Sequence, residues 1–262
     1  MIDTQTFVLP CFVGNAEDGL RALKKSLNAD LVDLQSSSLD QLIRIADYLE
    51  IFAAEISNSI GNGNVVITIC GDCLSCIGTL KGLQNSGIDP VLVWLDAHGD
   101  FHTWETTESN FLGGMPLAMI SGRGDQRIVK QVGLSPLKDE NIYLCDARSI
   151  EVLEKKSLTE SNINWLGSSL DFANVDFKQK PVHLHFDTDF LSPSFAPAMR
   201  YSAPSVVSGP DVLGILRHIV SSGKLVSLSI SAWAPELDTD GKTQEYCVDL
   251  IKEMILTIQK SE

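Results

Sequence analysis

The sequence predicts an α/β fold, a single three-layer domain over residues 1–262 in which helices flank both faces of a mainly parallel β-sheet. Short apolar runs recur along the chain, and segments with helical periodicity separate them, as in a parallel sheet with helical crossovers. No linker, repeat or low-complexity segment divides the 262 residues, and 44% of them are hydrophobic, which is enough for a sizeable core.

Six apolar runs are the expected strands. The run at 65–69 is typical, because it is β-branched and ends at the turn residues Gly71 and Asp72. In chain order, the expected strands cover residues 6–13, 65–69, 90–95, 141–145, 182–186 and 225–230.

The expected helices begin at capping residues or prolines. The segment Ser38-Leu39-Asp40 caps the first, Ser149 caps a later one, and Pro116 and Pro210 each open another. In chain order, the first helix runs from 40 toward 61, the second ends at 87 after the strand at 65–69, and the third runs from 116 to about 122. The fourth begins at 149, the fifth begins at 210, and the last runs from 244 to 260.

Two aspartate-rich segments follow two of the expected strands. One contains Asp96, His98 and Asp100, and the other contains Asp187 and Asp189. Side chains in a strand alternate between faces, so a spacing of two aims each set in one direction, at the sheet edge where parallel strands bind ligands. Converging acidic groups are costly as unpaired charges, and divalent cations relieve that cost. Helix N-capping explains one such aspartate more readily than the whole set.

These segments resemble the motifs of the ureohydrolase family, which includes arginase, agmatinase and formimidoylglutamase. Residues 96–100 match the pattern Asp-Ala-His-x-Asp, and residues 186–189 match Phe-Asp-x-Asp. Residues 109–116 resemble the substrate loop of the family, and residues 191–198 resemble its Leu-Asp-Pro-Ser-x-x-Pro-Ala motif. Gly71-Asp72-Cys73 lies where the family has Gly-Asp-His. Together the matches span about residues 65–235.

The resemblance implies an arginase-like fold and a site for two manganese ions (two Mn²⁺ per chain). Asp96 and Asp187 would bridge the ions, which would convert a bridging water to hydroxide. Asp100 would also accept a proton from that water and pass it to the leaving nitrogen. The implied metal ligands are Cys73, Asp96, His98, Asp100, Asp187 and Asp189, and the implied substrate-binding residues are His102 and Ser109.

Cys73 departs from the family pattern, which has histidine at this position. Thiolate is softer and more negative than imidazole, so it should weaken the Lewis acidity of the site. Cysteine here is similar to the ligand of an N-ω-hydroxy-L-arginine hydrolase, whose products are ornithine and hydroxyurea. Two alternatives remain: Cys73 is a buried residue without a metal, or Cys70, Cys73 and Cys76 hold zinc or an iron–sulfur cluster.

The substrate pocket departs from the family as well. Gly113 stands in place of a histidine that helps to move protons, and Ala232 in place of a glutamate that pairs with guanidinium. Met199 and Tyr201 replace two threonines beside the same group. We therefore expect hydroxyarginine to be preferred over arginine. Arginase, agmatinase or formimidoylglutamase activity, or a catalytically silent homologue, are the alternatives.

The net charge of −14 argues against nucleic acid or an anionic membrane as a partner. The six cysteines are expected to be reduced thiols in a cytoplasmic enzyme, and the resemblance implies a homo-oligomer that acts on a small guanidino or amidine substrate. His183 and His185 are expected to be core histidines or partners of the metal ligands. Arg200 is either an anchor for an acidic substrate or a solvated charge.

Overall fold

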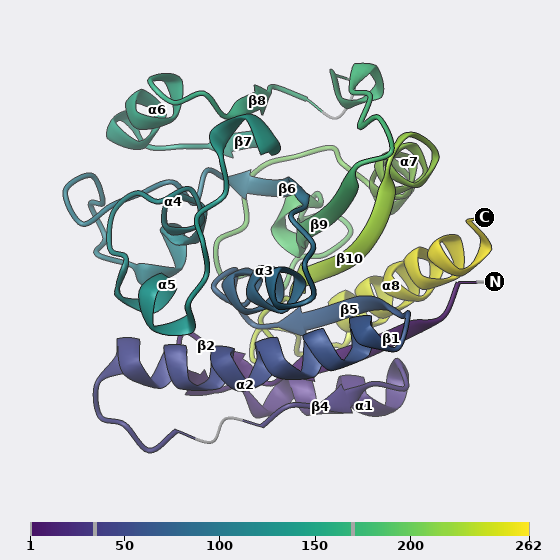
Figure 1. Ribbon diagram of the computed structural model, residues 1–262. Helices are drawn as coiled ribbons and strands as arrows, with labels where there is room; N and C mark the ends of the chain where they lie inside the picture. The colour runs from purple at the N-terminus through teal and green to yellow at the C-terminus, as the bar shows by residue number, and fades with distance from the viewer. Residues whose placement is uncertain (1, 34–35, 169–170, 262) are drawn as a thin grey trace.

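The computed structural model describes residues 2–33, 36–168 and 171–261. Within these ranges, eight parallel strands form one sheet in the order β4-β1-β5-β10-β9-β6-β7-β8, which runs from the bottom to the top of Figure 1. The strands are β1 (Thr4–Leu9), β4 (Asp30–Leu31), β5 (Val65–Cys70), β6 (Val91–His98), β7 (Ile142–Ser149), β8 (Asn164–Leu166), β9 (Pro181–Asp187) and β10 (Lys224–Ser231). A small antiparallel pair, β2 (Cys11–Phe12) and β3 (Asn15–Ala16), follows β1.

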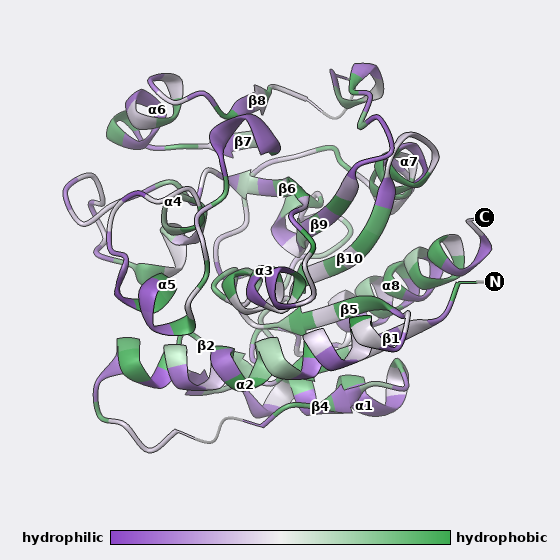
Figure 2. Cartoon of the chain, in the orientation of Figure 1, coloured by the Kyte–Doolittle hydropathy of each residue, from purple (hydrophilic) through white to green (hydrophobic). Residues whose placement is uncertain are grey.

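Helices cover both faces of this sheet, which confirms the predicted α/β fold (Figure 1). They are α1 (Leu23–Ser26), α2 (Gln41–Gly61), α3 (Ser75–Asn85), α4 (Pro116–Ile120), α5 (Arg127–Val132), α6 (Val152–Thr159), α7 (Gly209–Ser222) and α8 (Lys242–Lys260). Residues of α2, α3, α4 and α5 belong to one buried apolar cluster, and residues of α1, α7 and α8 belong to a second. Hydrophobic and hydrophilic residues alternate along α2 and α8 in Figure 2, as amphipathic helices between a core and solvent require.

The strand order places a topological switch beside the predicted ligands. After β5, the chain crosses to β6 and leaves a gap that β9 and β10 later fill. In an open parallel sheet, the carboxyl ends of strands on either side of such a switch are the usual place for a ligand. The structure therefore brings the ends of β5, β6, β9 and β10 to one edge.

Most predicted elements are present, with shifted ends. Asp40 caps α2, since its carboxylate accepts hydrogen bonds from the backbone N–H groups of Leu42 and Ile43. The predicted cap at Ser149 is wrong, because that residue still belongs to β7. Glu151 caps α6 instead, in a reciprocal capping box with Glu154. The predicted strand at 6–13 stops at Leu9, where Pro10 interrupts the ladder. No helix in the described part of the chain is long and apolar enough to cross a membrane.

Candidate metal centre

A cavity of about 790 Å³ opens at the carboxyl edge of the sheet. Its wall comes from the ends of β5, β6, β9 and β10 and from the loop before α4. All the residues that the sequence singled out as site residues lie on this wall: Cys73, Asp96, His98, Asp100, His102, Ser109, Asp187 and Asp189.

Strand geometry explains only part of this convergence. Asp96 and His98 lie on β6 and Asp187 ends β9, but Asp100 and Asp189 lie beyond the strands. The expectation that strand alternation alone aims all five side chains is therefore wrong. Asp189 lies in a 3₁₀ turn, η5 (Thr188–Phe190). Asp100 lies in a loop and has a left-handed backbone conformation, with φ 48°.

Two groups of potential metal ligands share one carboxylate. Among the described residues, Cys73, Asp96 and Asp187 form one group, and Asp96, His98 and Asp189 form the other, with ligand atoms within 4.8 Å of one another in each group. Cys73 Sγ lies 3.0 Å from Asp187 Oδ2, and His98 Nδ1 lies 3.0 Å from Asp189 Oδ2. We call the first group the thiolate half and the second the imidazole half. Asp96 can contact ions in both.

The charges of this cluster are poorly balanced by protein groups alone. Burial raises the pKa of Asp96 and that of Asp189, and in each case a neighbouring carboxylate raises it further. Burial and the charge of Asp189 raise the pKa of Asp187 to about 8. Burial opposes a charge on His98, but its contacts with Asp189 and Asp96 raise its pKa to about 12. The cluster therefore favours added positive charge, and carboxylate and imidazole ligands suit divalent cations.

Asp100 belongs to neither half, but it lies close enough for the charge of Asp96 to affect its carboxyl group. It is buried, and its Oδ2 atom has no hydrogen-bond partner among the described residues. Burial, followed by the charge of Asp96, raises its pKa well above the usual value. Its backbone carbonyl is held by the N–H groups of Leu117 and Ala118 at the start of α4, at 3.0 and 3.2 Å. A buried carboxylate oxygen without a donor is what a cation, a water or a substrate group would complete.

Two residues that the sequence analysis did not identify support the ligands from behind. The indole N–H of Trp94 donates to Asp96 Oδ2 at 3.0 Å, and Arg148 donates to the backbone carbonyl of Asp189 at 2.9 Å. Asp146, which forms an ion pair with Arg148, has a left-handed backbone (φ 82°). The i, i+2 spacing of Trp94 and Asp96 on one strand was a usable signal, whereas Arg148 carried none.

His102 and Ser109 line the cavity but already have partners. His102 Nε2 lies 3.2 Å from Glu154 Oε2 and 3.4 Å from Glu151 Oε2, and the hydroxyl of Ser109 accepts a hydrogen bond from the Phe111 backbone at 3.2 Å. Glu151 and Glu154 also line the cavity, through the capping box that opens α6. These two carboxylates suit a cationic group of a ligand. No sequence motif had indicated that Glu151 and Glu154 would line the cavity.

The residues that depart from the family pattern gather on the same cavity. Gly113, Met199, Tyr201 and Ala232 all contribute to its wall. A Cβ atom at Gly113 would lie 2.4 Å from the ring of Phe111, which shows that this ring fills the space of any larger side chain. The wall is therefore apolar where the family carries a histidine.

The cysteine run Cys70, Cys73 and Cys76 does not converge on one point. Cys70 Sγ contacts the Cys11 carbonyl at 3.3 Å, whereas Cys76 Sγ lies 3.3 Å from His183 Nε2. The alternative of a cluster held by these three thiols is wrong, because the chain passes from strand to helix and spreads them.

Arg200 is an ion-paired residue of the cavity wall, and its charge is not simply solvated. It pairs with Glu17 at 2.6 Å and with Glu236 at 2.9 Å, and its guanidinium stacks 4.0 Å from the centroid of the Phe12 ring. The expectation of a solvated charge is therefore wrong, whereas an anchor for an acidic substrate stays a prediction, since Arg200 also lines the cavity.

Known proteins share both the sequence pattern and the fold. A model of the arginase family matches residues 14–257. The chain is 29% identical over 237 residues to an arginase of Glaciozyma antarctica, covering 84% of this chain and 68% of that one, and 30% identical over 242 residues to an arginase of Bacillus caldovelox, covering 82% and 76%. The solved structure of Bacillus caldovelox arginase superposes with a TM-score of 0.81 at 24% identity, covering 97% and 98% of the two chains. The resemblance drawn from the motifs is thus confirmed, and the chain belongs to the arginase family.

Proposed function

We propose that this protein is a two-metal hydrolase that cleaves a C–N bond of a linear guanidino compound. Its favoured substrate is N-ω-hydroxy-L-arginine, with ornithine and hydroxyurea as products. The observation that carries the proposal is the pair of ligand groups that share Asp96 on the wall of one cavity. Two ions held close together need such a shared carboxylate, because it offsets their mutual repulsion.

The ligand set suits manganese, since it is mostly oxygen with one imidazole and one thiolate. Cys73, Asp96 and Asp187 would hold one ion, and Asp96, His98 and Asp189 the other. The family resemblance adds Asp100 as a ligand of the first ion and Asp187 as a second bridge. When bound, the two ions supply Lewis acidity and lower the pKa of an attacking water.

The protein side chains would move the proton and orient the substrate. Asp100 can take the proton of the attacking water on its unpartnered Oδ2 atom and pass it to the departing amine. We assign substrate contacts to His102 and Ser109, which lie on the cavity wall. The carboxylates of Glu151 and Glu154 would attract the α-ammonium group of an amino-acid substrate.

The substrate preference rests on the apolar wall. Ala232 offers no carboxylate to a guanidinium cation, and a lost charge-assisted hydrogen bond typically costs about 1.5–3 kcal/mol. Hydroxylation lowers the basicity of the guanidine, so that a neutral bound form is accessible. A neutral substrate loses less by the absence of that carboxylate.

A substrate panel with one manganese-loaded preparation tests the proposal. We expect kcat/KM for N-ω-hydroxy-L-arginine to exceed that for arginine, agmatine and formiminoglutamate. Equal or better turnover of arginine would show that the apolar wall does not set the preference. Two metal equivalents without turnover of any of these compounds would favour a second candidate, a catalytically silent homologue, which the filled space at Gly113 also supports.

A further inference from the structure

A ladder of alternating histidines and serines runs between β9 and β10. The strand register pairs His183 with Ser227, His185 with Ser229, and Asp187 with Ser231. Each histidine Nδ1 lies 2.7 Å from the hydroxyl of its paired serine. Each histidine Nε2 faces the next serine along β10, at 3.1 Å for Ser229 and at 3.5 Å for Ser231.

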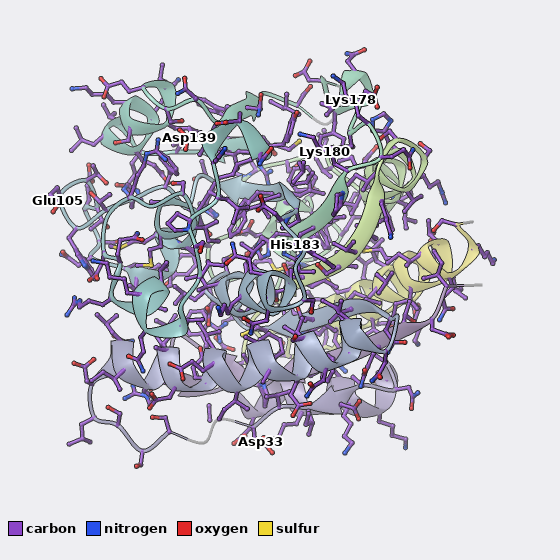
Figure 3. All side chains as sticks on the ribbon, in the orientation of Figure 1. Asp33, Glu105, Asp139, Lys178, Lys180 and His183 are labelled. Carbon is purple, nitrogen blue, oxygen red and sulfur yellow. The ribbon has the colours of Figure 1, made fainter. Side chains whose placement is uncertain are left out.

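The ladder ends at the thiolate half of the candidate metal centre. Ser231 Oγ lies 3.0 Å from Cys73 Sγ, which also contacts Asp187. The two histidines are fully buried, and Figure 3 shows His183 near the middle of the molecule. The ring of Trp94, which donates to Asp96, packs on the His185 ring with centroids 3.9 Å apart and fixes its plane. The ladder therefore links the core of the sheet to Cys73.

Both imidazoles are fully buried and contact serine hydroxyls, a setting that favours the neutral ring. Burial also lowers the pKa of His183, to about 3. A neutral imidazole has one nitrogen that donates and one that accepts. A histidine that accepts from one serine must therefore donate to the next, so all the hydrogen bonds of the ladder run in the same direction along the strands.

Cys73 sets that direction if it binds a metal, because a thiolate ligand can only accept a hydrogen bond. Ser231 must then donate to the sulfur, and its oxygen accepts from His185 Nε2. His185 Nδ1 in turn accepts from Ser229, whose oxygen accepts from His183 Nε2, with Cys76 Sγ as a second acceptor at 3.3 Å. Ser227 donates to His183 Nδ1 at the far end.

We propose that Ser231 is a positioning residue that aims its hydroxyl proton at Cys73, and that the ladder fixes this direction by holding His183 and His185 as Nε2–H tautomers. The proposal rests on the proposed function only in taking Cys73 as a metal ligand. Groups behind a ligand commonly orient it and tune its affinity for the ion. Here Ser231 and the ladder would orient the Cys73 thiolate, at a position where the family has histidine.

Nitrogen-15 NMR of the zinc-loaded protein tests the direction, since Zn²⁺ is diamagnetic. The chain has five histidines, and single-histidine variants assign their signals. His218 is an internal reference, because its Nε2 lies 2.6 Å from the Val175 carbonyl and must carry the proton when the ring is neutral. We expect the Nε2–H pattern for both His183 and His185. The Nδ1–H pattern at either ring would overturn the proposal.

Cadmium binding tests the effect on Cys73 without any assay of turnover. The ultraviolet charge-transfer band of a cadmium–thiolate bond reports ligation by sulfur. In Ser231→Ala, we expect the affinity reported by this band to fall by about 10–100-fold, as for other groups that support a ligand. Ser59→Ala removes a buried hydroxyl remote from the ladder and should leave the affinity unchanged.

Unchanged cadmium affinity in a folded Ser231→Ala protein would overturn the positioning role. Absence of the band in the unmodified protein would instead contradict Cys73 as a ligand, and with it the metal site of the proposed function. The NMR spectra report the histidine tautomers whether or not cadmium binds Cys73. A failure of the Ser231 proposal can therefore be told apart from a failure of the proposed metal site.

Discussion

The thiolate half and the imidazole half of the candidate metal centre share Asp96 but differ in charge and softness. The thiolate half combines two carboxylates with Cys73, whereas the imidazole half combines two carboxylates with His98. The first would place three negative charges on an ion, and the second only two. Since manganese prefers oxygen and nitrogen ligands, the imidazole half should bind it more tightly, and softer ions should favour the thiolate half.

The two halves are also held in different ways. Behind the thiolate half lies the ladder that ends at Ser231. The imidazole half is held by one backbone N–H and one guanidinium, since Ala97 N–H donates to the Asp189 carboxylate at 3.2 Å and Arg148 donates to the Asp189 backbone carbonyl at 2.9 Å. The candidate ligands of the two halves are therefore supported by different kinds of groups in this chain.

Asp96→Asn should have the largest effect, because it removes the ligand that both halves share. We expect manganese affinity to fall by more than about 100-fold at both positions, exceeding the loss typical of groups outside the ligand set. Elemental analysis after dialysis measures the occupancy. The exposed Asp249→Asn should retain the full metal content. If Asp96→Asn loses only one equivalent of manganese per chain, Asp96 is not a ligand of both ions.

Cys73→Ser and His98→Asn should separate the halves. Each keeps the approximate size of the side chain but weakens one ligand, so each variant should retain about one tightly bound ion in place of two. Cys73→Ser should also lose its preference for cadmium, whereas His98→Asn should keep it. If Cys73→Ser leaves both the metal content and the cadmium preference intact, Cys73 is a buried thiol without a metal.

Ala232→Glu should have a smaller effect, on substrate choice rather than on metal. Ala232 follows β10 on the cavity wall, and a carboxylate there could pair with a guanidinium cation. We expect the ratio of kcat/KM for arginine to that for hydroxyarginine to rise by about 10–100-fold, which corresponds to one charge-assisted hydrogen bond. Ala232→Gln, which has a similar volume but no charge, is the matched control. An equal rise in both variants would point to shape instead of charge.

The fold and the position of the site could be predicted from the sequence because both depend on local patterns. Apolar runs gave the central strands, and the aspartates after β6 and β9 marked the edge where ligands gather. The edge strands β4 and β8 were not predicted, since each is short and forms only because a neighbouring strand pairs with it.

The details of the cavity depend on contacts between residues far apart in the chain. His102 meets Glu154 across 52 positions, and Cys73 meets Ser231 across 158. The ring of Phe111 over Gly113 depends on the loop conformation, which no periodicity encodes. The two-residue spacing singled out Asp100 and Asp189, and the family resemblance added their roles as ligands, but strand alternation was the wrong physical reason for their placement.

A manganese titration of the metal-free protein, followed by the electron paramagnetic resonance signal of free Mn²⁺, is the best test of two unequal ion positions that share Asp96. We expect two bound equivalents with distinct affinities, the tighter one lost in His98→Asn and the weaker one in Cys73→Ser. A single equivalent, or two equivalents of equal affinity that respond alike to both substitutions, would contradict two unequal halves joined at Asp96.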